Sequence, residues 1–298
     1  IQYYFKDLGE SKGHTWCSEK ILRAAISNNI YECCNKVDWL LENNDFLHID
    51  NGRIGLKYYY DIEMQIYHLI LNKSQIETTI NISDEAIDKA IKHAEEEQGF
   101  DYVVEQLDTI HKSLHRTVSL ITGKAGTGKT SIMRAIVKAY MENNYMMTAS
   151  ALSAMAAQRI TEATEFPAMT IHRTLGCQGL NDFTYNKDNH LITDVAFLDE
   201  GSMVNASLFL HWLEAIGDNT RIIISGDHKQ LPPIVFGNVF SDLIEMFDKS
   251  VVSKLVKPMR QAEKSGILVD ANKIRENINP ISEKLQPRII HGELQDMY

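Results

Sequence analysis

The chain has few cysteines and no matched set of them, which excludes a disulfide-rich secreted domain. There are 4 cysteines in 298 residues, and the adjacent Cys33 and Cys34 cannot easily bridge to each other. We therefore expect reduced, mostly buried thiols, as in a cytoplasmic protein. The alternative is a zinc site made of His14, Cys17, Cys33 and Cys34, but this spacing matches none of the usual zinc-finger patterns.

Long apolar runs and an excess of basic charge are also lacking. No apolar stretch reaches the roughly 18 residues that a membrane span needs, and no secretory signal pattern is present, so we expect a cytoplasmic protein with no membrane partner. The 30 basic residues are outnumbered by 40 acidic ones, for a net charge of −10. Such a charge opposes contact with many phosphates at once, so any nucleic-acid contact should be local, as in a motor that touches one strand.

The hydrophobic rhythm divides the chain into three regions, at residues 1–95, 96–258 and 259–298. In the first region we predict an amphipathic helix capped by Ser18, a helix over 31–42, a hairpin turning at Asn51-Gly52, and a helix over 59–72. Helices combined with a hairpin suggest a small, mostly helical, winged-helix-like N-terminal domain.

This N-terminal domain has two interpretations. It is either a packing module, with the Tyr58-Tyr59-Tyr60 run at a core or interface edge, or a DNA-reading wing. The hairpin carries only Arg53 and Lys57 as cations, which is few for a phosphate track. The packing module is therefore the favoured interpretation.

The second region has an α/β pattern, because short apolar runs alternate with helical segments. The runs lack polar alternation, which is typical of strands covered on both faces, so we predict a parallel β-sheet flanked by helices. Ligands of such folds bind at the carboxyl ends of the strands. The predicted strands are 118–122, 145–149, 194–198, 221–225 and 251–256.

A phosphate-binding loop follows the first of these strands. The segment Gly-Lys-Ala-Gly-Thr-Gly-Lys-Thr is a full P-loop motif between a strand and a helix. Its main-chain N–H groups and the helix N-terminus would surround the phosphates of a nucleoside triphosphate. Lys129 would contact the β and γ phosphates, and Thr130 would hold Mg²⁺. The predicted nucleotide-binding residues are Gly123, Lys124, Ala125, Gly126, Thr127, Gly128, Lys129, Thr130 and Ser131.

Two carboxylates end the strand at 194–198. Asp199 would bind Mg²⁺, and Glu200 would orient and deprotonate the attacking water. An apolar run that ends in Asp-Glu is common, and the alternative is an ordinary strand terminus. The P-loop upstream favours the catalytic interpretation.

The strand at 221–225 leads into Gly226-Asp227-His228-Lys229-Gln230-Leu231-Pro232-Pro233. This segment resembles helicase motif III of superfamily 1. The resemblance implies that Gln230 senses the γ-phosphate, since a neutral amide both donates and accepts hydrogen bonds. A proline-terminated turn is the alternative.

Other segments resemble the RecD-like branch of these helicases, which includes the exodeoxyribonuclease V alpha subunit. Thr170-Ile171-His172-Arg173-Thr174-Leu175-Gly176, Asp199-Glu200-Gly201-Ser202-Met203-Val204 and Met259-Arg260-Gln261 carry the likeness. It implies a RecA-like P-loop domain that uses ATP and Mg²⁺, an adenine-reading Gln106 and an arginine finger at Arg260. Alternatively, Gln106 is a solvated helix residue and Arg260 a surface arginine. The implied DNA-contacting residues are Thr148, Ser150, Thr170 and His172.

The chain departs from this family in motif Ia. Relatives carry Pro-Thr-Gly there, whereas this chain has Ala151-Leu152-Ser153 after Thr148. The main-chain turn that contacts DNA in relatives therefore lacks its Pro and Gly in this chain, so the predicted contact with DNA differs here. The chain also starts with Ile1 and reaches Tyr298 before motifs V and VI, so we expect a piece of a longer protein in which 259–298 begins a second motor domain.

The function implied by the resemblance is an ATP-dependent DNA helicase or translocase that moves 5′-to-3′ on single-stranded DNA. Its expected partners are single-stranded DNA or a duplex with a 5′ overhang, and a protein bound through the N-terminal domain. One alternative is an ATP-gated DNA-binding or scaffolding protein that does not unwind. A P-loop kinase of a small molecule is a weaker alternative, because it has no use for the Gln230 segment.

Overall fold

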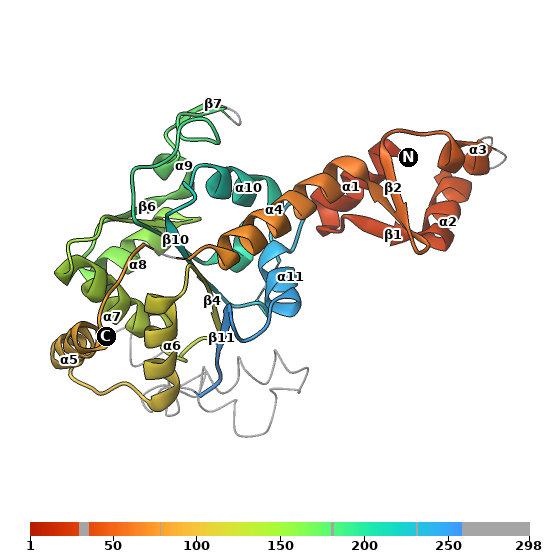
Figure 1. Ribbon diagram of the computed structural model, residues 1–298. Helices are drawn as coiled ribbons and strands as arrows, with labels where there is room; N and C mark the ends of the chain where they lie inside the picture. The colour runs from red at the N-terminus through yellow and green to blue at the C-terminus, as the bar shows by residue number, and fades with distance from the viewer. Residues whose placement is uncertain (30–35, 78, 180–181, 231, 258–298) are drawn as a thin grey trace, which may run out of the picture.

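The computed structural model describes residues 1–29, 36–77, 79–179, 182–230 and 232–257, in two parts that one long helix joins. Helix α4 (Lys57–Gln75) begins in the smaller N-terminal part and ends against the larger α/β part (Figure 1). Within the described residues, no helix has both the length and the apolar content needed to span a bilayer.

The N-terminal part is a small antiparallel sheet with helices around it. Its strands β1 (Trp16–Ser18), β2 (Leu47–Asp50) and β3 (Arg53–Leu56) are ordered β1-β3-β2. The predicted hairpin is present, and Asn51 and Gly52 have φ of 47° and 74°, as a two-residue turn requires. The helices of this part are α1 (Gln2–Lys12), α2 (Glu19–Asn29) and α3 (Val37–Glu42).

Some N-terminal elements differ from the sequence-based expectation. The main-chain N–H of Ile21 donates to Ser18 Oγ at 3.4 Å, at the start of the helix predicted there. In contrast, α1 and β1 were not predicted. Of the helix expected over 31–42, residues 36–42 lie in the described part of the chain and its first residues lie outside it. The winged-helix-like assignment and the boundary at 95 stay predictions.

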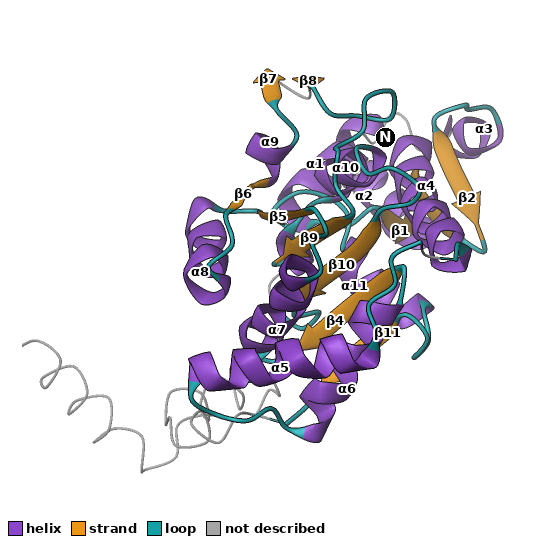
Figure 2. Ribbon diagram, turned by 60° about the vertical axis from the view of Figure 1, so that its left-hand side comes forward, coloured by secondary structure: helices purple, strands orange, loops and turns teal. Residues whose placement is uncertain are grey.

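The larger part contains a six-stranded, fully parallel sheet in the order β11-β4-β10-β9-β5-β6. The predicted parallel sheet flanked by helices is confirmed, and Figure 2 shows its strands side by side. The sixth strand, β6, was not predicted. The strands are β4 (Val118–Gly123), β5 (Met147–Ala151), β6 (Ala168–Thr170), β9 (Val195–Asp199), β10 (Arg221–Gly226) and β11 (Val252–Leu255).

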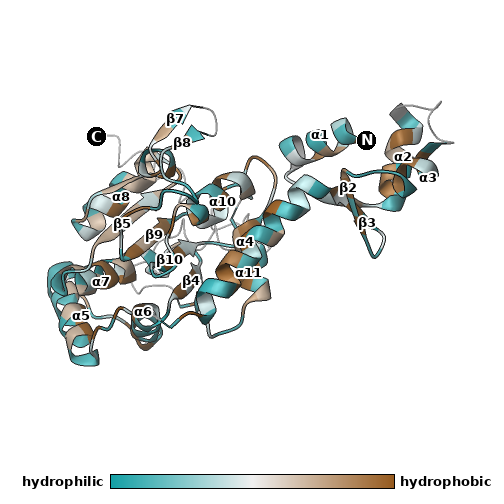
Figure 3. Cartoon of the chain, turned by 45° about the horizontal axis from the view of Figure 1, so that its top comes forward, coloured by the Kyte–Doolittle hydropathy of each residue, from teal (hydrophilic) through white to brown (hydrophobic). Residues whose placement is uncertain are grey.

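Helices cover both faces of this sheet. Neighbouring residues of one strand point to opposite sides, so Ile223 of β10 joins one buried apolar cluster while Ile222 and Ile224 join the other. The cluster of Ile223 is closed by α5 (Asp84–Gln98), α6 (Val104–His115), α7 (Lys129–Glu142) and α8 (Ala154–Thr164). The opposite cluster is closed by α4, α10 (Ala206–Glu214) and α11 (Val239–Met246). The central strands β9 and β10 are accordingly coloured hydrophobic in Figure 3.

Short elements complete the α/β part at one end of the sheet. Helix α9 (Ile171–Thr174) follows β6 and leads into the strand pair β7 (Cys177–Gly179) and β8 (Asp182–Phe183). A single 3₁₀ turn, η2 (Gly201–Met203), follows β9.

Helix α4 is fastened to the α/β part by a buried lysine. Lys73 Nζ donates to the main-chain oxygens of Gly217, Asp218 and Thr220 at 2.7, 3.0 and 3.1 Å. Burial lowers the pKa of Lys73 to about 8. The three carbonyl acceptors compensate much of the cost of placing an amine there.

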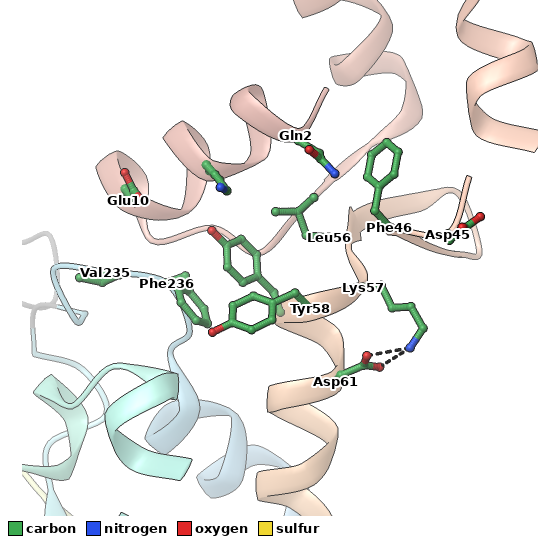
Figure 4. A pocket seen from close by; sticks show the side chains of 12 residues that line it. Gln2, Glu10, Asp45, Phe46, Leu56, Lys57, Tyr58, Asp61, Val235 and Phe236 are labelled. Atoms are coloured by element: carbon green, nitrogen blue, oxygen red, sulfur yellow. Dashed lines mark hydrogen bonds and ion pairs between the residues drawn. The ribbon is translucent and has the colours of Figure 1, made fainter. Parts of the chain in front are cut away.

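An aromatic contact joins the other end of α4 to the α/β part. The ring of Tyr59 stacks on that of Phe236, with centroids 4.1 Å apart, and Tyr58 lies beside the same ring (Figure 4). Tyr59 and Phe236 are both buried. The interpretation of the tyrosine run as an interface edge agrees with this packing.

Candidate active site

The P-loop lies between β4 and α7, and its glycines are required by its backbone. Gly126 and Gly128 have φ of 80° and 88°, a left-handed conformation that other residues adopt at a cost. At Gly123, a Cβ would lie 2.5 Å from Thr127 Oγ1. The loop therefore keeps its main chain close and its N–H groups accessible, as a phosphate cradle needs.

Lys129 begins α7 and reaches back over the loop. Its Nζ donates to the main-chain oxygen of Gly123 at 2.6 Å and to that of Lys124 at 3.3 Å. Thr127 Oγ1 also donates to Lys124 O, at 2.8 Å. The ammonium group is thus held at the mouth of the loop, beside the N-terminus of α7, where it would meet the outer phosphates of a nucleotide.

One cavity brings the predicted groups together at the carboxyl edge of the sheet. It has a volume of about 550 Å³, and Asp199, Glu200 and Gln230 line it together with the P-loop. Six residues of the predicted nucleotide-binding set other than Lys129 also line it, namely Lys124, Ala125, Gly126, Gly128, Thr130 and Ser131, whereas Gly123 and Thr127 do not. Three strand ends therefore deliver phosphate-binding, acidic and amide groups to one place.

Asp199 and Glu200 occupy different environments although they are adjacent. Asp199 ends β9 and its Oδ1 accepts a short hydrogen bond from Ser225 Oγ. Glu200 has φ of 55°, which turns the chain at the cavity. Burial, and secondly the charge of Asp199, raise the pKa of Glu200, whereas Arg159 and Lys129 act in the opposite direction. A carboxylate with a raised pKa is a better proton acceptor, which suits a general base.

The Gln230 segment is tied to its neighbours by side-chain hydrogen bonds. Thr122 Oγ1 and His228 Nδ1 are 2.7 Å apart, which joins the loop to β4. The N–H of Asp227 donates to Ser202 Oγ at 3.3 Å, and that of Gln230 to Asp227 O at 2.9 Å. Gln230 itself is exposed at the cavity. An anchored loop with an exposed amide at the cavity is suited to a sensing role.

Gln106 is buried and bonded within the protein, which excludes the solvated alternative. Its Oε1 accepts from the N–H of Val103 at 3.1 Å, and its Nε2 donates to the main-chain oxygen of Thr127 at 3.1 Å. Both ends of the amide are used in this conformation. Adenine recognition by Gln106 therefore stays a prediction. In this structure, the hydrogen bond from Gln106 to Thr127 supports the P-loop.

Sequence analysis missed several residues that line the cavity, among them Arg159 of α8 and Phe100. Arg159 lies on the same side of α8 as Ala156 and Ile160, which also line it. The sequence does show an arginine in the first helix after β5, which could have drawn attention to Arg159. Only the packing of α8 shows that the Arg159 side chain faces the cavity. Arg159 adds a further cation to Lys124 and Lys129 at the cavity.

The four predicted DNA-contacting residues lie in and after β5 and β6 in different environments. Thr148 is half-buried and His172 is exposed, while Thr170 caps α9 by accepting from the N–H of Arg173 at 3.3 Å. Ser150 is fully buried, and its hydroxyl bonds with that of Thr174 at 3.0 Å. A DNA strand could therefore contact only the main chain at Ser150, because the Ser150 side chain packs inward. Arg260 lies outside the described residues.

A second hollow, of about 630 Å³, lies between the N-terminal part and the start of α4 (Figure 4). Tyr58, Phe46 and Phe236 line it, and Lys57 pairs with Asp61 at its edge at 2.7 Å. No glycine-rich loop is among its lining residues, and Lys57, at the N-terminus of α4, is already paired with Asp61. The phosphate-binding features belong to the other cavity.

The parallel sheet, the glycine-rich loop and the acidic strand end define a P-loop nucleotide-binding domain. Comparison with known families places it more narrowly: residues 101–295 match the family described as AAA domain, and the chain belongs to that family.

Similarity to curated proteins confirms the predicted likeness to RecD-type helicases. The chain is 25% identical over 309 residues to the RecBCD enzyme subunit RecD of Buchnera aphidicola, covering 90% of this chain and 49% of the relative. It is 33% identical over 184 residues to the ATP-dependent RecD2 DNA helicase of Deinococcus radiodurans, covering 62% and 24%. The chain thus spans half or less of the length of these relatives. Among solved structures, the Pif1 helicase from Candida albicans matches at a TM-score of 0.44 and 25% identity, covering 58% of this chain and 44% of that one.

Proposed function

We propose that the chain is the ATP-hydrolysing motor portion of a DNA helicase that moves 5′-to-3′ on single-stranded DNA. The observation that carries this proposal is the convergence of the P-loop, Asp199, Glu200 and Gln230 on one cavity. A kinase needs the first two features, but an amide on an anchored loop beside them fits a motor that must register loss of a phosphate. The name of the Deinococcus radiodurans relative, a DNA helicase, supports the same activity.

The site has the donor set that a Mg²⁺–ATP complex needs. The N–H groups of the loop and Lys129 would bind the phosphates, and the Thr130 hydroxyl and the Asp199 carboxylate, both at the cavity, are the oxygen ligands that Mg²⁺ prefers. When bound, Mg²⁺ supplies charge neutralisation at the β and γ phosphates. The hydrogen bond from Ser225 Oγ already orients the Asp199 carboxylate, so little conformational entropy would be lost when it binds the ion.

Glu200 would accept the proton of the attacking water, and Lys129 would stabilise the charge that develops on the transferred phosphoryl group. Gln230 would hydrogen-bond to the γ-phosphate and release it after hydrolysis. Arg260, which lies outside the described residues, is proposed as the arginine finger by resemblance alone. Gln106 is proposed to favour ATP over other nucleotides, in addition to its contact with the P-loop.

The DNA strand is proposed to pass along the β5–β6 edge of the sheet, where Thr148, Thr170 and His172 lie. His172 is exposed and its ring lies 6.2 Å from that of Phe183. Phe183 is buried, so the exposed imidazole of His172 is the ring that could stack on a base, a contact that depends little on sequence. The negative net charge agrees with a contact limited to a few nucleotides.

A physical route from the nucleotide to the N-terminal part runs through the Gln230 segment. Its downstream residue Phe236 stacks on Tyr59 of α4. Movement of Gln230 toward or away from a phosphate would therefore displace Phe236 and, through its stack on Tyr59, the start of α4. The N-terminal part also exposes Tyr3 and Trp39, at 83% and 62%, and we propose that a protein partner binds there.

The direct test uses the intact gene product with ATP, Mg²⁺ and short oligonucleotides. We expect single-stranded DNA to stimulate ATP turnover, and a duplex with a 5′ overhang to be unwound while one with a 3′ overhang is not. Unwinding from the 3′ overhang alone would overturn the direction. Tight ATP binding without stimulation by DNA would favour the alternative, an ATP-gated scaffolding protein.

A further inference from the structure

Four side chains with metal-binding chemistry meet where α5 and α6 pack side by side, in the half of each helix that lies away from the P-loop. Asp84 and Asp88 are four residues apart on α5, and His111 and His115 are four residues apart on α6. Residues at this spacing lie on one face of a helix, one turn above the other. Two histidines therefore face two carboxylates across a helix pair.

The distances suit coordination of a single ion. Asp84 Oδ1 lies 2.9 Å from His115 Nε2 and 3.7 Å from His111 Nδ1. The ligand atoms of Asp84, His111 and His115 all lie within 4.8 Å of one another. In a tetrahedral zinc site, bonds of about 2.0–2.1 Å place neighbouring ligand atoms roughly 3.3 Å apart. The two distances from Asp84 Oδ1 lie on either side of that value.

Asp88 gives the cluster a feature that chance ion pairs lack. It lies 3.1 Å from His111 Nε2, the ring nitrogen that does not face Asp84. An Nε2–H that donates to Asp88 leaves the Nδ1 lone pair directed toward Asp84 and His115. A carboxylate that holds the second nitrogen of a histidine ligand in this way fixes its tautomer and raises its basicity.

We propose that Asp84, His111 and His115 form a site for a divalent transition-metal ion, with Zn²⁺ as the fitting occupant and Asp88 as the carboxylate that orients His111. Two imidazoles with one carboxylate suit Zn²⁺ better than Mg²⁺ or Ca²⁺, which prefer oxygen ligands alone. His115 and Asp84 are exposed and His111 is half-buried, so a water molecule completes the coordination.

The consequence of such a site is structural. The α5–α6 pair carries, at its other end, two glutamines that support the P-loop region: Gln98 accepts from Ser131 Oγ at 2.6 Å, and Gln106 donates to Thr127 O. An ion that joins the two helices would fix the pair on which both contacts depend. The site takes no part in the chemistry of the nucleotide.

The experiment measures thermal unfolding of the chain, free of any histidine tag, with Zn²⁺ or with a chelator and without nucleotide. We expect Zn²⁺ to raise Tm by several degrees, because binding to the folded state alone stabilises it. Co²⁺ should bind at one equivalent and give visible d–d bands without a thiolate charge-transfer band. A thiolate band would assign the metal to cysteine and overturn the proposal.

Variants separate the site from general histidine binding. His115→Ala should abolish the Tm shift and the cobalt bands, and Asp88→Asn should weaken Zn²⁺ affinity about 10–100-fold without abolishing it. The matched control is His93→Ala, since His93 of α5 also pairs with a carboxylate, Glu142, at 2.8 Å, but belongs to no metal-binding cluster among the described residues. His115 is 46% exposed, so its loss should leave the metal-free Tm nearly unchanged. A Zn²⁺ shift kept in His115→Ala, or none in the unaltered chain, would overturn the proposal.

Discussion

The side-chain amide of Gln106 donates to the main-chain oxygen of Thr127 across 3.1 Å, and so attaches α6 to the P-loop. Because the same amide accepts from the N–H of Val103, it closes the start of α6 and supports the loop at once. The residue expected to read the base thus also holds the loop that binds the phosphates.

Replacing Gln106 separates these two roles. Gln106→Ala leaves the buried Thr127 oxygen and Val103 N–H without this partner, which should cost ~1–3 kcal/mol of unfolding free energy. If support of the loop dominates, affinities for ATP and GTP should fall by equal factors in a competition assay. Gln106→Glu still accepts from Val103 but cannot donate to Thr127, and serves as the matched variant. A loss confined to ATP would instead assign Gln106 to adenine recognition.

Lys129→Ala should abolish ATP hydrolysis while the fold remains. The variant removes the cation that Gly123 and Lys124 carbonyls hold at the mouth of the loop, and loss of such a preorganised donor lowers kcat by about 10²–10³ or more. Single-turnover hydrolysis measures this, with circular dichroism to check the fold. Lys138→Ala is the control: it lies on the same helix and pairs with Glu97 outside the cavity. Turnover retained in Lys129→Ala would move the active site elsewhere.

Glu200 should set the acidic limb of the pH profile. Since burial and Asp199 raise its pKa, the active carboxylate form is lost as pH falls through a value above the usual ~4.3 of glutamate. Arg159→Gln removes a charge that lowers this pKa, so the acidic limb of kcat/KM should move to higher pH. Arg134→Gln, on α7 and outside the cavity lining, should leave the limb in place. Glu200→Gln should bind ATP and hydrolyse it about 10²–10⁴-fold more slowly. An unmoved limb in Arg159→Gln would remove Glu200 as the titrating base.

Features fixed by local chemistry could be predicted from the sequence, and features fixed by packing could not. The P-loop and the Asn51-Gly52 hairpin follow from positive φ at named positions, and strands such as β10 follow from continuous apolar runs. Strand β6 was missed because its residues Ala168–Thr170 form no such run, and its pairing with β5 supplies the hydrogen bonds. Helix packing directs Arg159 into the cavity and brings His111 close to Asp84. These contacts could not be predicted, because no short sequence segment determines how helices pack against each other.

The aromatic stack between Tyr59 and Phe236 should connect the nucleotide site to the N-terminal part. Phe236→Leu keeps an apolar side chain but loses the ring contact at 4.1 Å. We expect basal ATP turnover within about 2-fold of the unaltered chain, since the ring does not line the cavity, and a clear fall in stimulation by single-stranded DNA. Phe247→Leu is the control, because Phe247 packs on Tyr67 of the same helix, 5.7 Å between centroids. Equal effects of both variants would show that general loosening of α4, and not this route, is responsible.

A half-buried acid makes the region where α4 meets α11 sensitive to pH. Burial, with a smaller contribution from Asp242, raises the pKa of Glu63 to about 7, against a hydrogen bond from Thr15 that lowers it. The folded state therefore holds a proton between about pH 4.5 and 7 that the unfolded chain has lost, so stability falls as pH rises through this window and stays lower above it. Glu63→Gln removes the charge, and should raise the unfolding free energy by ~2 kcal/mol at pH 8 but little at pH 4.5. Urea unfolding at the two pH values measures the difference, and Glu77→Gln, at an exposed position, should change neither. A gain from Glu63→Gln that is equal at both pH values would show that side-chain packing, not ionisation of this carboxyl, determines the effect.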